Sequence, residues 1–280
     1  MKSFKILFLI AVFFACRYNA QPFNLKSVGE AKEFGLKIYY GTHGKGAFVQ
    51  YKGQKGIIPL KIKKVAIDDS QREYNQPNFT SYVWDEVVNE KITGVYYLTE
   101  GLRDVFDIQY IRKKDNRVFK LVLDEDKSKK YDGVNQFLLY DALISYNTFA
   151  NNHLTIKYSE TEQLKTELPD IDNPNYSRQA IIEDYNFDGF DDISFSIPDG
   201  GMGVYRVFSV FIYNTKTKKF EKLIEPDFSK SKCECLCDLK MDKSKKIISS
   251  ECRGGARWWK DLYQYKTGRL VWVSSQEIVD

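Results

Sequence analysis

The feature that most constrains this chain is the repetition of short apolar–polar alternations along most of its length. Between about residue 36 and residue 125, runs such as "GLKIYYG" and "KITGVYYLTEG" are separated by Gly or Asp-Asn. A period of two places successive side chains on opposite faces of a strand. The segment "KKDNRVF", residues 113–119, is typical of a tight hairpin, because Asp and Asn tolerate positive φ. We expect a small antiparallel barrel or sandwich here.

The second half of the chain continues in shorter strands. Runs such as "DDISFSI", "YRVFSVFIYN" and "RLVWVSS" are joined by brief turns at residues 214–218, 243–244 and 267–268. Frequent turn signals of this kind are typical of sandwiches, barrels and propeller-like folds. We therefore expect an all-β chain whose second part is an antiparallel meander or propeller-like domain. Residues 24–34 and 136–146 are the two candidate short helices.

The first twenty residues have the pattern of a secretory signal peptide. A basic start with Lys2 and Lys5 precedes ten apolar residues, and Ala20 offers a cleavage position. Ten apolar residues are too few to span a bilayer, which needs about 20. The alternative is a lipid anchor at Cys16, because "FFAC" loosely resembles a lipobox. Either way we expect an exported protein, located in the periplasm, in the cell envelope or outside the cell, with no transmembrane segment.

Composition shifts suggest two domains after the signal peptide. The charged segment 124–133 and the Pro-, Asn- and Asp-rich segment 166–179 are both candidate boundaries. We place the boundary at Asp132, because "HLTIKY" at residue 153 suits the first strand of a second unit. The domains are then 1–20, 21–132 and 133–280. Removal of residues 1–20 lowers the net charge from +4 to +1, which gives no electrostatic case for nucleic-acid binding.

An acidic stretch, "DYNFDGFDD", interrupts the strand pattern at residues 184–192. Its polar side chains occupy positions 1, 3, 5 and 9 of a loop with Gly189 at position 6, as in calcium-binding loops. Position 12 is Phe195, so a complete EF-hand is not expected, and Asp192 or Asp191 would close the coordination shell. The alternative is a solvated turn that binds nothing. The expected Ca²⁺ ligands are Asp184, Asn186, Asp188, the backbone carbonyl of Phe190, and Asp192.

Two glycine-rich loops follow, "DGGMGVYR" at residue 199 and "RGGARWW" at residue 253. Each alone suits a bulged hairpin connection covering the edge of a core. Together they favour a binding edge, because Arg, Tyr and Trp dominate the centres of protein interfaces. The candidate partner-binding residues are Gly201, Met202, Gly203, Tyr205, Arg253, Arg257 and Trp258.

Four cysteines follow the signal region, at positions 233, 235, 237 and 252. In an exported protein, disulfides are the default expectation. If Lys243-Ser244 is a hairpin tip, Cys252 lies opposite about Cys235, which favours a Cys235–Cys252 bridge. Pairing of Cys252 with Cys233 or Cys237 is the alternative. A four-cysteine zinc site is disfavoured, because C-x-C-x-C is not the usual zinc spacing.

Catalytic motifs are not found in the sequence. His43 and His153 are the only histidines, and neither lies in a recognisable motif. The G-x-S-x-G, H-E-x-x-H and Walker patterns do not occur. We expect a protein that is not an enzyme.

Residues 179–273 resemble a known family. The matching segments, in order, are "IEDYNFDGFDDI", "GGMGVYRVFSVFIYN", "KKFEKLIE" and "KKIISSECRGGARWWKDLYQYKTGRLVWV". Their order and spacing are similar to those of exported calcium-binding immunity proteins, which inhibit lysozyme-like peptidoglycan hydrolases. That family looks related to periplasmic inhibitors of invertebrate-type lysozyme. The resemblance covers about a third of the chain and does not reach residues 21–150.

The resemblance implies a small all-β fold with Ca²⁺ held by Asp184, Asn186, Asp188 and Asp192. Lysozyme inhibitors of several kinds insert a Ser-Gly-x-x-Tyr loop into the enzyme cleft, and residues 201–205 look similar, although Gly200 replaces the serine. We therefore expect an inhibitor of a lysozyme-like glycoside hydrolase. The alternative is a calcium-stabilised surface or envelope module for adhesion or structure, with no enzyme target.

Overall fold

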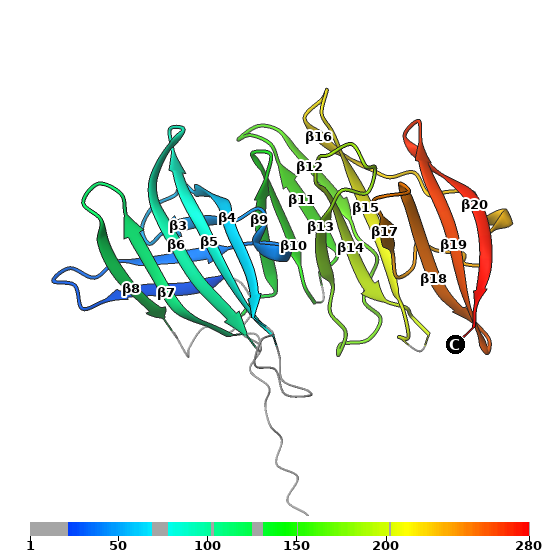
Figure 1. Cartoon of the computed structure of the whole chain (residues 1–280), viewed down its shortest axis with the longest axis horizontal. Helices are drawn as coiled ribbons and strands as arrows, with labels where there is room; N and C mark the ends of the chain where they lie inside the picture. The colour runs from blue at the N-terminus through cyan, green and yellow to red at the C-terminus, as the bar shows by residue number, and fades with distance from the viewer. Residues whose placement is uncertain are drawn as a thin grey trace, which may run out of the picture.

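The computed structural model describes residues 22–68, 78–101, 104–124, 131–149, 151–201 and 203–279 (Figure 1). In these ranges the chain is all-β, with twenty strands and two single-turn 3₁₀ helices, η1 (Thr42–Gly44) and η2 (Phe228–Lys230). This confirms the expected fold class. The signal segment with Cys16, and Met202 in the first glycine-rich loop, lie outside the described residues.

The N-terminal part is a closed antiparallel barrel in which each strand pairs with its neighbours in sequence. Its strands are β1 (Phe23–Val28), β2 (Gly35–Tyr39), β3 (Phe48–Tyr51), β4 (Ile58–Asp68), β5 (Phe79–Val88), β6 (Lys91–Gly101), β7 (Asp104–Arg112) and β8 (Arg117–Leu123). Pairing of Leu25 with Leu123 closes β1 onto β8. Closure leaves the sheet without free edges, and alternate side chains such as Ile38, Trp84 and Tyr96 fill the interior.

The expectation of a short helix at residues 24–34 is wrong. Residues 23–28 form β1, in which Phe23 and Leu25 are buried and Asn24 is exposed. The period-two burial, together with pairing on both sides to β2 and β8, outweighs any local helical preference. The same holds for residues 136–146, which form a hairpin in which Ile144 pairs with Phe137.

Three four-stranded antiparallel sheets follow the barrel in a row (Figure 1). The first sheet contains β9 (Val134–Leu139), β10 (Ala142–Asn147), β11 (His153–Lys157) and β12 (Gln163–Glu167); the second contains β13 (Gln179–Glu183), β14 (Asp192–Pro198), β15 (Arg206–Asn214) and β16 (Lys219–Lys222); the third contains β17 (Lys240–Asp242), β18 (Ile247–Gly254), β19 (Arg257–Lys266) and β20 (Arg269–Ile278). Every sheet is a meander of consecutive strands. The expected domain boundary at Asp132 falls between β8 and β9. The segment from residue 153, expected as the first strand of the second unit, is instead its third strand, β11, because β9 and β10 precede it.

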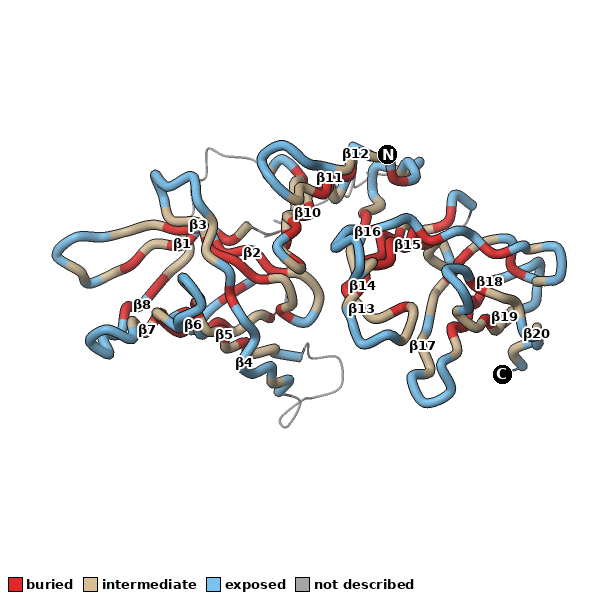
Figure 2. The backbone as a smooth tube through the Cα atoms, turned by 90° about the horizontal axis from the view of Figure 1, so that it is seen from above, coloured by how far each residue is buried: buried red, intermediate tan, exposed pale blue. Residues whose placement is uncertain are grey.

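The second sheet is buried on both faces, which explains its near-continuous apolar runs. Phe195 and Phe211 pack into a core shared with the first sheet, where the ring of Phe195 lies edge-on to Tyr146 with centroids 5.1 Å apart. Val210 and Ile212 pack into a second core shared with the third sheet. Figure 2 shows the buried residues of β14 and β15 together in the middle of this part. Both ends of this central sheet carry a loop singled out in the sequence.

The barrel contacts the first two sheets through residues 41–46. The Thr42 hydroxyl donates a hydrogen bond to the carbonyl of Ala180 at 3.0 Å, and the backbone N–H of Leu138 donates to the carbonyl of Gly46 at 2.8 Å. Gly46 has a φ of +62°, and a side chain there would collide with the backbone of Leu138. Glycine is therefore required for this close approach.

Candidate functional site

The acidic loop joins β13 to β14 at one end of the central sheet (Figure 1). Its backbone wraps around its own carboxylates. The N–H of Asp188 donates to Asp184 Oδ1 at 3.2 Å, and that of Gly189 donates to Asp184 Oδ2 at 2.9 Å. Asn186 Oδ1 accepts the N–H of Asp188 at 3.0 Å. Gly189 has a φ of +90°, the conformation in which glycine avoids the strain of a side chain.

Asp192 lies at the base of this loop and is fully buried. Its Oδ1 accepts the backbone N–H of Tyr213 at 2.7 Å, and its Oδ2 accepts that of Tyr185 at 2.9 Å. Burial raises the pKa of the Asp192 carboxyl to about 7, opposed by these two hydrogen bonds and reinforced by the charges of Asp188 and Asp184. Asp192 thus connects the loop to β15 and carries a charge that is costly to bury alone.

The donor atoms of the loop suit a hard cation. Carboxylate, carboxamide and backbone carbonyl oxygens are the ligands that Ca²⁺ prefers. No three His, Cys, Asp or Glu side chains of the described ranges converge closely enough to hold a metal ion, because the carboxylates of Asp184 and Asp188 are turned to loop N–H groups. The residues fit Ca²⁺ by type and spacing, and binding of the ion stays a prediction.

The two lysines nearest the loop pair with acids beside the expected ligands. Lys45 of the barrel contacts Asp191 at 2.5 Å, and Lys243 contacts Glu183 at 2.7 Å. The backbone N–H of Asp191 donates to the Tyr140 hydroxyl. Asp191 therefore links the loop to the barrel and the first sheet, and Asp192 is the better candidate to close a coordination shell.

The raised pKa of Asp192 predicts an unusual pH dependence of stability in metal-free protein. Its folded-state pKa of about 7 lies above the ordinary value of 3.8, so its stabilising contribution is present below about pH 4 and is lost as pH rises through 7. In EDTA, the free energy of unfolding should fall between pH 5 and pH 8 by up to about 3 kcal/mol more in wild type than in Asp192→Asn. Urea unfolding of both proteins measures this. Equal pH profiles would contradict it.

The first glycine-rich loop lies at the opposite end of the central sheet, between β14 and β15 (Figure 1). Asp199, which the sequence analysis did not single out, organises it. The Asp199 carboxylate accepts the N–H groups of Gly201 at 3.1 Å and Tyr205 at 3.2 Å, and its own N–H donates to the Tyr205 carbonyl at 2.9 Å. Gly203 has a φ of +66° and packs so closely on Tyr176 that a side chain would collide with its ring.

The second glycine-rich loop is the tight turn between β18 and β19. Gly254 pairs with Arg257, and Arg253 pairs with Trp258. Residues 253–257 are all exposed, and Arg257 makes one surface ion pair, with Glu277 at 3.5 Å. Such a pair contributes little to stability, so the guanidinium is available to a partner.

The structure brings these two loops to one edge. Tyr205 from the first and Trp259 from the second pack against the same cluster of Cys233, Cys237 and Cys252. The cysteine segment lies between the sheets, because the N–H of Phe208 donates to the carbonyl of residue 236 and that of Glu251 donates to the Cys237 carbonyl. We call residues 199–201, 203–205 and 253–259 the loop edge.

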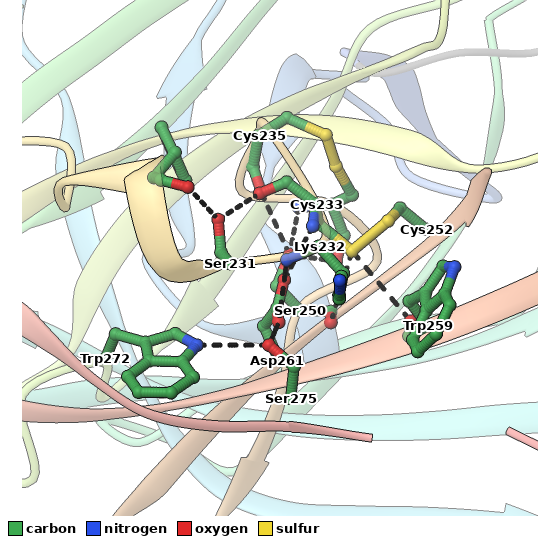
Figure 3. Close-up of a disulfide and its surroundings, with 12 residues drawn as sticks. Ser231, Lys232, Cys233, Cys235, Ser250, Cys252, Trp259, Asp261, Trp272 and Ser275 are labelled. Carbon is green, nitrogen blue, oxygen red and sulfur yellow. Dashed lines mark hydrogen bonds between the residues drawn. A yellow bond between two sulfur atoms is a disulfide. The ribbon is translucent and has the colours of Figure 1, made fainter. Parts of the chain in front are cut away.

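The cysteine pairing differs from the sequence prediction. Cys252 is bonded to Cys233, with Cα atoms 5.7 Å apart, and Cys235 is bonded to Cys237 (Figure 3). The prediction of a Cys235–Cys252 bridge assumed that the residue pairing of the hairpin continues past the end of its strand as far as the cysteines. Strand β17 begins only at Lys240, so the cysteine segment does not follow the hairpin register.

A buried acid that sequence reasoning missed fixes this segment. Asp261 of β19 is fully buried and accepts the backbone N–H groups of Lys232 and Cys233, the latter at 2.7 Å, and the Ser275 hydroxyl (Figure 3). The sequence does contain a signal for it. In the strand "RWWKDLYQY", Asp261 occupies a position that alternation places facing inward, and a buried carboxylate requires hydrogen-bond donors. The loop edge therefore rests on a disulfide and a buried carboxylate.

Comparisons with known proteins leave the chain without an assigned family: no family model, no curated protein and no solved structure matches it. Within the described ranges, no helix is both long and apolar enough to cross a membrane.

Proposed function

We propose that this chain is an exported calcium-binding β protein that acts by binding, with the loop edge contacting and inhibiting a lysozyme-like glycoside hydrolase. The observation that supports this most is the convergence of both glycine-rich loops on one cysteine cluster. Tyr205 and Trp259 are thereby brought together, and two exposed arginines lie in the same hairpin as Trp259. These residue types carry most of the energy at protein interfaces.

The chemistry of the loop edge is complementary to that of a glycosidase cleft. Such enzymes hydrolyse sugars with a pair of carboxylic acids. Arg253 and Arg257 present guanidinium groups, which pair with carboxylates through two parallel hydrogen bonds. The Asp199 hydrogen bonds and the Cys233–Cys252 bridge hold the loops in place before contact. Ordered loops lose less conformational entropy on binding, which favours affinity. Tyr205 would enter the cleft despite Gly200 replacing the serine of similar loops.

A pull-down and an inhibition assay against lysozyme-type muramidases test the proposal. Wild type should bind and inhibit at least one of them. The double variant Tyr205→Ala with Arg253→Ala should weaken binding by about 100-fold or more, since it removes two interface anchors. The matched control is Tyr97→Ala with Lys64→Ala, a tyrosine and a cation exposed on the barrel wall, which should bind like wild type.

Failure of wild type to bind any muramidase, or equal binding by the loop-edge variant, would remove the inhibitor proposal. The calcium-stabilised surface or envelope module, with no enzyme target, would then be the better description. That outcome leaves the calcium prediction intact, because it is tested by stability and not by partner binding.

A further inference from the structure

A cleft of about 910 Å³ lies between the barrel and the first two sheets. Its size falls in the range of small-molecule sites. One wall comes from the barrel at residues 40–43 and the end of β6, another from β9 and β10, and the third from residues 174–181. The bonds of Thr42 to Ala180 and of Gly46 to Leu138 fix these walls relative to one another, so the cleft is formed in advance of any ligand.

Arg178 in the third wall carries an unused donor. Its side chain is 2% exposed. Its terminal nitrogens donate to three backbone carbonyls, those of Asn147, Asn151 and Pro169, at 2.7–2.9 Å. Its Nε atom is buried and has no hydrogen-bond partner, and no carboxylate of the described residues lies within ion-pair distance. A buried N–H without an acceptor costs free energy, and Arg178 is one of the residues that line the cleft.

Glu100, in β6, lines the barrel wall of the cleft. Its carboxylate accepts a hydrogen bond from the Tyr82 hydroxyl at 3.3 Å, and burial raises its pKa. The rings of Phe23, Tyr40 and Tyr82 form a continuous aromatic wall beside it, with centroids of successive rings 6.0 and 5.3 Å apart. These rings are only 4–6% exposed, so they give the cleft an apolar backing next to one strong hydrogen-bond acceptor.

Carboxamides and one exposed ring complete the lining. Asn175 and Gln179 are exposed at the rim, and in the described part of the chain their side-chain amides bond to no other residue. Each amide presents both donors and an acceptor. Phe149 lines the cleft and is 36% exposed, so part of an aromatic ring is open to solvent there.

We propose that this cleft binds a neutral oligosaccharide. Glu100 and Arg178 give the lining one carboxylate and one guanidinium, so the cleft has no single sign of charge that would select an anion or a cation. Paired amide and carboxylate groups match the donor–acceptor pattern of sugar hydroxyls, and aromatic rings pack against the apolar faces of sugar rings. The first glycine-rich loop packs against the third wall of the cleft, where Gly203 lies against Tyr176, so the cleft and the loop edge are tested with separate variants.

Isothermal titration of the mature chain with tri-N-acetylchitotriose, cellotriose and maltotriose tests the proposal, with inorganic phosphate as the anion probe. At least one trisaccharide should bind and phosphate should not. Phe149→Ala and Glu100→Gln should each weaken that binding by about tenfold, the effect of losing one ring contact or one charged hydrogen bond. The matched control is Phe106→Ala, which removes an exposed ring on the barrel wall outside the cleft and should bind like wild type.

Circular dichroism confirms that each variant is folded before it is compared. Binding of phosphate in place of the trisaccharides would overturn the neutral-ligand assignment. Binding of none of the three sugars, or affinities unchanged in both cleft variants, would overturn the site itself. The Phe149→Ala and Glu100→Gln variants should still inhibit a muramidase that wild type inhibits. This result would show that sugar binding in the cleft and inhibition by the loop edge are separate activities.

Discussion

Removal of Ca²⁺ with EDTA should lower the melting temperature of the mature protein by about 5–10 °C. At a free concentration a hundred times the dissociation constant, a ligand stabilises the folded state by about 2.7 kcal/mol, and a chain of this size shifts by about 2–4 °C per kcal/mol. The physical reason lies in Asp192, whose buried charge has no cationic partner within ion-pair distance among the described residues. Differential scanning fluorimetry with Ca²⁺ and with EDTA measures the shift.

Two variants in the same loop separate a bound ion from general loop effects. Asp188→Ala removes a predicted ligand and should abolish the difference between Ca²⁺ and EDTA. Asp191→Asn removes the charge that contacts Lys45, lowers stability in both conditions, and should leave the difference in place. A melting temperature in wild type that is indifferent to millimolar Ca²⁺, or a response retained by Asp188→Ala, would contradict calcium binding at this loop.

Local patterns in the sequence predicted the strands and turns well. The expected hairpin at residues 113–119 is present, with Arg112 paired to Arg117 and Asn116 at a φ of +53°. The turn at Thr267-Gly268 is equally clear, since both residues have positive φ. These features depend on neighbours in sequence, so turn chemistry and period-two alternation suffice to place them. Closure of the first eight strands into a barrel rather than a sandwich was left open, because it depends on pairing between β1 and β8.

Long-range features were not predictable in the same way. The two candidate helices became strands because partners distant in sequence pair with them. Glu86 is buried inside the barrel, where it accepts hydrogen bonds from Tyr110 at 2.8 Å and Tyr96 at 3.2 Å. Nothing near Glu86 in sequence indicates these donors. The Cys233–Cys252 bridge likewise depends on how residues 232–238 cross between two sheets.

The candidate site was predictable in its parts but not in its assembly. Spacing alone marked the acidic loop, and composition alone marked both glycine-rich loops. Their joint position on the cysteine cluster requires the stacking of the second and third sheets, which the alternation pattern does not encode. The cleft beside Arg178 could not be predicted from local patterns. Its first and third walls come from segments about 140 residues apart, as the Thr42–Ala180 contact illustrates.

Replacement of Asp261 by alanine should be among the most destabilising single changes in the third sheet, costing about 3–5 kcal/mol. The carboxylate is fully buried, and its loss would leave the N–H groups of Lys232 and Cys233 without acceptors, at about 1–3 kcal/mol for each buried group. Urea unfolding under oxidising conditions measures the loss, and Glu225→Ala, an exposed acid upstream in the chain, is the matched control and should change stability by less than about 0.5 kcal/mol.

The Asp261→Ala substitution should also loosen the loop edge, because Asp261 is connected to it through the cysteine segment. Asp261 holds the N–H of Cys233 at 2.7 Å, and Cys233 is bonded to Cys252, which pairs with Trp259 across the hairpin. Once that hydrogen bond is lost, the Cys233–Cys252 bridge should be reduced by dithiothreitol faster than in wild type, because the segment opens more often. Reduction at the wild-type rate, together with a stability loss below about 1 kcal/mol, would show that Asp261 does not support this edge.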